Sequence, residues 1–323
     1  MKKLFLLIAV FTSLVIVACT SEGEPEDLVL TLDWFPNANH AGIYEAVDRG
    51  YFADEGLNVS VVPPADPSAI LSLVASGQSD FGMFYQPDLM QARDAGVPVV
   101  AIAGVVQKPL NSMMALKSSG IDRPGKLAGK KVGYPGIPWN EAMLTTMLEA
   151  DGLTREDVEL IDVGFALTQA LLAGTVDAVV GAYWTHESIA MENEGYPVNI
   201  LRMEDWGVPA YYELILVTNE KLPQNDSDTA RRFVRAFLRG YEEAGKDPQA
   251  AVDALARAHP EIDQAIDRPG VELIAPLWTD GVPSFGWQTA ERWAEFAGWL
   301  ASNGFIQEGL DPEAAFTNEL VEG

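Results

Sequence analysis

"LVASGQSDFGMFY" at residues 73–85 and "LLAGTVDAVVGAY" at residues 171–183 share one pattern, and this pattern decides the fold class. Each begins as an apolar helix, passes through G-x-x-D, continues as an apolar strand and ends at a tyrosine, either Tyr85 or Tyr183. The spacing from aspartate to tyrosine differs by one residue, so the two segments indicate a similar architecture and not a strict repeat. Helices that alternate with strands predict mostly parallel sheets covered by helices.

The flanking sequence continues this alternation in two rounds. In the first round, "LVLTLDW" alternates as a strand should, and residues 41–49 read as a helix closed by Gly50. A second round begins near residue 130, and the chain becomes largely helical after residues 210–218, which read as a further strand. We therefore predict an α/β protein with two lobes.

Ligands of open α/β sheets bind beyond the carboxyl ends of the strands, and the candidate site residues follow such ends. They are Asp33, Trp34, Tyr85, Tyr183 and Glu187. Aromatic faces stack on flat heterocycles, and carboxylates accept hydrogen bonds from ring amines. The alternative, which remains open at this point, is that the rings fill the core or rim and the acids are solvated.

Two further features could contribute to the same cleft. His40 either lines the cleft or caps the helix that starts beside it. The loop "GYPGIPWNEA" (133–142), with Pro135 inside it, is a rigid strand-to-helix turn whose backbone N–H groups could hold a polar ligand group. An ordinary turn would have the same composition.

Composition narrows the possible functions. The 47 acidic residues outnumber the 21 basic ones and give a net charge of −26, which opposes binding to nucleic acid or anionic lipid. The sequence contains no nucleophile elbow, dinucleotide fingerprint or metal-ligand spacing, so we expect no enzymatic activity, no cofactor and no metal.

The N-terminus has the form of an export signal. Two lysines precede an apolar run, and residues 16–19, "IVAC", resemble a bacterial lipobox that contains the single cysteine, Cys19. We predict a signal peptide at 1–18, lipidation of Cys19 and a polar tether at 19–27. A plain signal peptide with an incidental cysteine, or an uncleaved anchor, is the alternative.

Several longer motifs resemble one family, the bacterial thiamine-precursor substrate-binding proteins of ABC importers, within the thiamine-pyrimidine-synthase-like superfamily. These motifs are "LDWFPNANHAGIYEAVDRGYFADEGL", "FYQPD", "GYPGIPWNEA", "DVGF", "DAVVGAYWTHE" and "GVPAYYELILVTNE". Several of them are similar to the branch that binds formylaminopyrimidine, a thiamine breakdown product. The resemblance covers residues 28 to about 240.

The resemblance implies a two-lobed type II periplasmic-binding fold, in which the chain crosses twice between lobes, at 111–117 and 211–217. It predicts lobe one at 28–114 plus 212–323 and lobe two at 115–211. It also implies that Trp34, Tyr85 and Tyr183 stack on a pyrimidine while Asp33 and Glu187 bind its polar edge.

The resemblance further implies an extracytoplasmic, membrane-anchored monomer that delivers formylaminopyrimidine or hydroxymethylpyrimidine to an ABC permease. Riboflavin, thiamine, or a sulfonate or nitrate remain alternative ligands. An enzymatic branch of the superfamily, the pyrimidine synthases, shares the W-x-P-x-x-x-H opening, here Trp34, Pro36 and His40. That branch carries a cysteine-rich motif before the second crossing, where this chain has "GVPAYYE" (207–213), so synthase chemistry is not expected.

Overall fold

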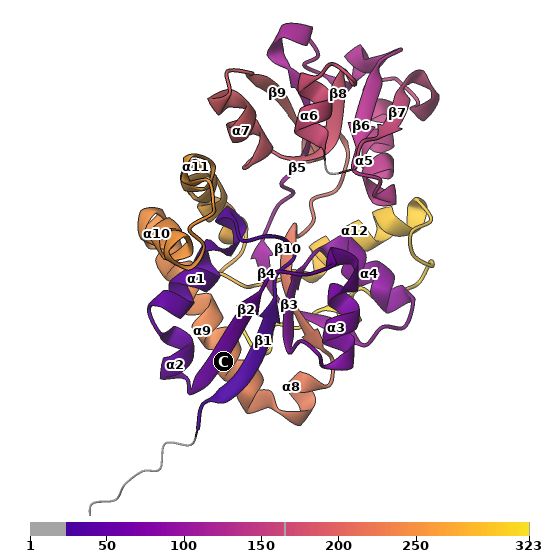
Figure 1. Ribbon diagram of the computed structural model, residues 1–323. Coiled ribbons are helices and arrows are strands. Elements are labelled where there is room, and N and C mark those ends of the chain that lie inside the picture. Colours follow the sequence, from indigo (N-terminus) through magenta and orange to yellow (C-terminus); the bar gives the residue numbers. More distant parts are fainter. Residues whose placement is uncertain (1–23, 165, 323) are drawn as a thin grey trace, which may run out of the picture.

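The computed structural model describes residues 24–164 and 166–322, which form two lobes stacked one above the other (Figure 1). The predicted signal peptide, lipidated Cys19 and most of the tether lie outside the described residues. Each lobe is built on a five-stranded sheet with helices on its faces. The predicted α/β class with two lobes is confirmed.

Lobe one contains the sheet with strand order β2-β1-β3-β10-β4. Its strands are β1 (Glu26–Thr31), β2 (Leu57–Val62), β3 (Phe81–Phe84), β4 (Val99–Val106) and β10 (Leu214–Asn219). The β1 strand is parallel to β2 and β3, with Leu28 opposite Val59 and Leu30 opposite Phe81. The reversed strand β10 is antiparallel to both of its neighbours, β3 and β4.

Lobe two repeats this arrangement strand for strand, in the order β7-β6-β8-β5-β9. Its strands are β5 (Asn111–Leu116), β6 (Lys131–Tyr134), β7 (Glu159–Asp162), β8 (Ala178–Tyr183) and β9 (Val198–Arg202). Here β5 is the reversed strand, antiparallel to β8 and β9. The two segments singled out in the sequence therefore lead into equivalent strands, β3 and β8, and both sheets are mixed but mostly parallel.

Strand pairing bears on where the chain crosses between the lobes. Residues 111–116 pair wholly within the sheet of lobe two, so the first crossing precedes Asn111 and does not run through 111–117. After the second crossing, strand β10 begins at Leu214, and the side chains of Tyr211 and Glu213 just before it form hydrogen bonds at the crossing, to Asn111 and Tyr183 among others. The division of the whole chain at 114/115 and 211/212 stays a prediction, with strand pairing favouring a boundary before Asn111.

Twelve α-helices cover the sheets in the described part of the chain. In lobe one they are α1 (Ala41–Asp48), α2 (Tyr51–Asp54), α3 (Ile70–Ser76), α4 (Gln86–Asp94), α8 (Leu222–Asn225), α9 (Ser227–Lys246), α10 (Pro248–Ala258), α11 (Gln264–Ile274) and α12 (Ala290–Ser302). In lobe two they are α5 (Pro138–Ala150), α6 (Leu167–Leu172) and α7 (Glu187–Asn193). None of the helices in residues 24–164 and 166–322 is both long and apolar enough to cross a membrane.

The long helix α9 shows why the core of lobe one closes tightly. Its first turn is capped by Asp226, and Phe233, Phe237 and Tyr241 recur every fourth residue on a buried face. The helix packs directly on α1, and a Cβ added at Gly42 would lie 2.3 Å from the Tyr241 ring. Only glycine allows this approach, which holds α1 and the loop before it in place.

The helices after β10 also touch lobe two from both sides. On one side, the Asn193 side chain of α7 donates to the carbonyl of Ala265 in α11, at 3.2 Å. On the other side, the indole of Trp299 in α12 donates to the hydroxyl of Thr146 in α5, also at 3.2 Å. Figure 1 shows α11 and α12 on opposite sides of the space between the lobes. The C-terminal part of lobe one therefore contacts lobe two on two sides.

Candidate functional site

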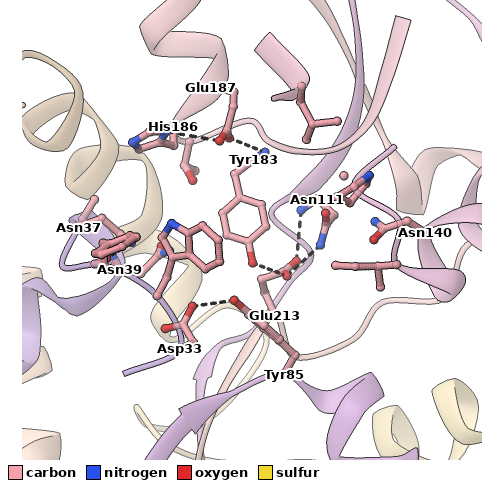
Figure 2. Close-up of a pocket in the computed structure, with 18 of the residues that line it drawn as sticks. Asp33, Asn37, Asn39, Tyr85, Asn111, Asn140, Tyr183, His186, Glu187 and Glu213 are labelled. Carbon is pink, nitrogen blue, oxygen red and sulfur yellow. Dashed lines mark hydrogen bonds and ion pairs between the residues drawn. The ribbon is translucent and has the colours of Figure 1, made fainter. Parts of the chain in front are cut away.

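A cavity of about 360 Å³ lies between the two lobes (Figure 2). Its volume lies within the range of small-molecule sites. Lobe one contributes the loop after β1 and the end of β3, and lobe two contributes the loop before α5 and the end of β8. The cavity therefore lies where the carboxyl ends of strands from both lobes meet, as expected for open α/β sheets.

Asp33 is the most firmly held residue of the lobe-one wall. Its carboxylate accepts a hydrogen bond from the Tyr85 hydroxyl at 2.8 Å and contacts Nε2 of His40 at 2.7 Å. The backbone N–H of Asn37 donates to Nδ1 of His40, so Nε2 carries a proton and donates to Asp33. His40 is fully buried, and the side chain of Asp33 is almost so. Each oxygen of Asp33 is therefore fixed in direction.

Glu213 is a second buried carboxylate of the wall, and it lies where the chain crosses between the lobes. The carboxylate accepts hydrogen bonds from the backbone N–H groups of Leu110 and Asn111 at 2.7 and 3.1 Å. It also accepts from the Asn111 amide at 2.9 Å and from the hydroxyls of Tyr183 and Tyr211 at 2.8 and 2.9 Å. Glu213 is fully buried, and burial raises the pKa of its carboxyl although these donors lower it. One side chain thus ties both crossings to a tyrosine of the cavity wall.

Tyr85 and Tyr183, the last residues of the two similar sequence segments, make equivalent hydrogen bonds. Tyr85 donates to Asp33, and Tyr183 donates to Glu213. Burial first, and then the carboxylate beside each ring, raise the pKa of both phenols well above the usual value. Both hydroxyls therefore stay protonated and donating, and their hydrogen bonds hold both side chains at the cavity wall (Figure 2).

Glu187 forms the upper wall in lobe two. As the first residue of α7, it accepts the Tyr183 backbone N–H at 2.7 Å, and its other oxygen lies 3.5 Å from Nδ1 of His186. Burial lowers the pKa of His186, but the carboxylate of Glu187, together with those of Asp267 and Asp263, more than offsets this and the pKa is raised. The side chain of Glu187 remains 30% exposed, so this carboxylate keeps room to accept from a ligand.

The structure brings the five candidate residues together around this one cavity. Asp33, Trp34, Tyr85, Tyr183 and Glu187 all line it, and so does the second-rank residue Pro135. His40 does not reach the wall; it caps the turn before α1 and supports Asp33 from behind. Direct ligand contact by any of these residues stays a prediction.

The sequence did not predict several polar residues of the wall, namely Asn37, Asn39, Asn111, Asn140, Thr185, His186 and Glu213. A signal for Glu213 was present, because it is the single acid inside the otherwise uncharged run "YYELILV". Asn111 opens an apolar strand, and its amide serves Glu213 and Tyr211. Asn140 lies within the turn that the sequence marked, but nothing in the pattern selects it.

The chemistry of the wall suits a flat and uncharged or cationic molecule. Aromatic rings alternate with carboxylates, and none of the described residues that line the cavity is lysine or arginine. Among the described residues, no group of histidine, cysteine, aspartate or glutamate has the geometry of a metal site. A two-lobed fold that holds such a cavity at its crossings defines a solute-binding protein.

The chain belongs to the NMT1/THI5 like family, which matches residues 37–251. It is 36% identical to the formylaminopyrimidine-binding protein of Halalkalibacterium halodurans, over 98% of this chain and 99% of that protein. It is 24% identical to a 4-amino-5-hydroxymethyl-2-methylpyrimidine phosphate synthase of Aspergillus parasiticus, over 92% of this chain and 87% of that protein.

Among solved structures, the fold matches the periplasmic aliphatic sulphonate binding protein SsuA of Escherichia coli with a TM-score of 0.70. The match covers 90% of this chain and 92% of that chain at 16% identity, so it concerns the fold alone. The predicted family and the type II periplasmic-binding fold are confirmed. The expectation of a binding protein rather than an enzyme is confirmed by the 36% identical relative, although other relatives are named as synthases.

Proposed function

We propose that this protein captures a thiamine-related aminopyrimidine, formylaminopyrimidine or hydroxymethylpyrimidine, in the cavity between its lobes. The observation that supports this proposal is the composition of the cavity wall. Trp34, Tyr85 and Tyr183 line one cavity together with the carboxylates of Asp33, Glu187 and Glu213. Such rings stack on a pyrimidine, and Glu187 keeps the capacity to accept from its amino group.

The charges of the wall argue against the anionic alternatives. A sulfonate or nitrate needs cationic or dense N–H donors, whereas the described wall carries Asp33, Glu187 and Glu213 and only His186 as a basic group. The 36% identical relative is named for formylaminopyrimidine, which supports the same ligand class here. Thiamine and riboflavin contain larger ring systems and serve as the comparison ligands.

The proposal includes the setting in which the protein works. The family resemblance and the fold support an extracytoplasmic binding component that passes its ligand to an ABC permease, for salvage of thiamine pyrimidines. The lipobox at residues 16–19 supports attachment to a membrane through lipidated Cys19. We place the folded protein as a monomer beside that membrane.

Titration calorimetry of the full-length protein in mild detergent tests the function. We expect saturable binding of about one equivalent of formylaminopyrimidine or hydroxymethylpyrimidine, and no heat with an alkanesulfonate. Chromatography of the released ligand should return the pyrimidine unchanged. Binding of the sulfonate alone would refute the ligand class, and turnover beyond one equivalent would refute the binding role.

A further inference from the structure

Asn140 differs from every other polar residue of the cavity wall considered above. Its side chain lies at the start of α5 and lines the cavity, yet the residue is only 1% exposed. Neither its amide oxygen nor its amide nitrogen has a hydrogen-bond partner among the described residues. Asn111, also on the wall, uses its amide nitrogen on both Tyr211 and Glu213.

The strand β8 approaches this amide closely at Gly181. A Cβ at Gly181 would lie 3.2 Å from the Asn140 amide nitrogen and 3.0 Å from the Pro135 ring, and Gly181 has a φ of +99° that favours glycine. The Asn140 backbone N–H is bonded to the carbonyl of Ile137 at 3.1 Å, which fixes the start of the helix. Figure 2 shows the amide directed from α5 toward the interior of the cavity.

Such an amide is unfavourable for the protein by itself. Nearly all buried polar atoms in native proteins have a partner, and each exception calls for an explanation. An apolar side chain of similar size would avoid the desolvation cost at this position. The amide is therefore suited to a partner that enters the cavity.

We infer that Asn140 is a specificity residue whose amide binds a neutral ligand group with one donor and one acceptor side by side. An amide matches such a group with two hydrogen bonds, one in each direction. The inference rests on the proposed function, and in the ligands proposed there two groups have this chemistry. One is a formamide in its cis conformer, which places the N–H beside the carbonyl oxygen, and the other is the edge formed by a ring nitrogen and the adjacent amino group.

The test compares Asn140→Leu with the parent in calorimetry and in thermal unfolding of the ligand-free, full-length protein. Leucine keeps the approximate volume and removes both polar atoms. Asn58→Leu, on the exposed edge strand β2, is the matched control for binding. Asn111→Leu removes an amide whose nitrogen donates to Tyr211 and Glu213 and is the matched control for stability.

We expect Asn140→Leu to weaken pyrimidine binding by about 10- to 100-fold, the loss of two neutral hydrogen bonds. Its unfolding midpoint should equal or exceed that of the parent, whereas Asn111→Leu should lower it. If only formylaminopyrimidine loses affinity, Asn140 binds the formamide; if hydroxymethylpyrimidine loses equally, it binds the ring edge.

Affinities within twofold of the parent for both pyrimidines would overturn the inference. A fall of the midpoint by several degrees together with weaker binding would also overturn it, because the amide would then be structural. If the parent binds neither pyrimidine, the proposed function fails, and the inference fails with it.

Discussion

Replacing Glu213 tests whether one buried carboxylate holds the two crossings together. In Glu213→Ala, the backbone N–H groups of Leu110 and Asn111 and the hydroxyl of Tyr211 lose their acceptor in the protein interior. An unsatisfied buried donor costs about 1–3 kcal/mol, so three of them cost about 3–9 kcal/mol. A whole domain is stable by only about 5–15 kcal/mol, so this single change should be severe.

Glu213→Gln removes the charge of the side chain but keeps its approximate shape. Its carbonyl oxygen can still accept from the two backbone N–H groups, and Tyr183 can turn its hydroxyl to accept from the new amide. The Asn111 amide nitrogen then faces another donor, which costs about 1–3 kcal/mol. Glutamine avoids the free-energy cost of burying a carboxylate charge, and this offsets part of the loss. That cost is present in the parent because burial raises the pKa of Glu213.

Urea unfolding followed by circular dichroism and tryptophan fluorescence measures both variants. We expect Glu213→Ala to lose at least about 3 kcal/mol and Glu213→Gln clearly less. Both should weaken ligand binding, because Tyr183 loses its fixed acceptor. Unfolding free energies of both variants within about 0.5 kcal/mol of the parent, a change typical of an unremarkable surface site, would refute the reasoning.

Four further outcomes follow from the site and the chain. Trp34→Ala should weaken all flat ligands by about 10- to 100-fold in calorimetry, since a lost stacking face costs about 1–3 kcal/mol. Glu187→Gln should weaken aminopyrimidines strongly but analogues lacking the amino group little; equal affinities for both classes would make Glu187 a bystander. Burial raises the pKa of Asp88 from 3.8 to about 7, so folding stability should fall as pH rises from about 4 to 7. Asp88→Asn should remove this slope and, at pH 8, be more stable than the parent by up to about 4 kcal/mol in urea unfolding. Mass spectrometry of membrane-extracted protein should find a diacylglyceryl group on Cys19, and Cys19→Ala should bind ligand normally but leave the membrane.

Local patterns were sufficient to predict the strands and helices and the strand ends that carry the candidate site. Tyr85 and Tyr183 were located because helix, turn and strand signals of short range precede them in both segments. The pattern could not fix the position of the first crossing, because "NSMMAL" is equally apolar in either sheet and its pairing with β8 and β9 depends on residues far along the chain.

The remaining polar residues of the site could not be predicted for a related reason. Glu213 is important because Asn111 and Tyr183, about 100 and 30 residues earlier, supply donors to it. Asn140 is distinctive because it lacks such partners. Both properties depend on contacts between distant segments, which composition and spacing do not encode.

The strand order of lobe one also determines when that lobe can be completed. At the edge of its sheet, β4 pairs with the strand β10 and, on its other side, forms isolated bridges with Gly286 and Phe316, all of which the chain reaches after the whole of lobe two. Until then the eight residues "VVAIAGVV" of β4, all buried in the finished fold, form an apolar strand with a free edge. Such a segment favours self-association in incomplete chains. Lobe two, whose strands run consecutively from Asn111 to Arg202, has no such dependence, and chains truncated before Leu214 should therefore aggregate through β4.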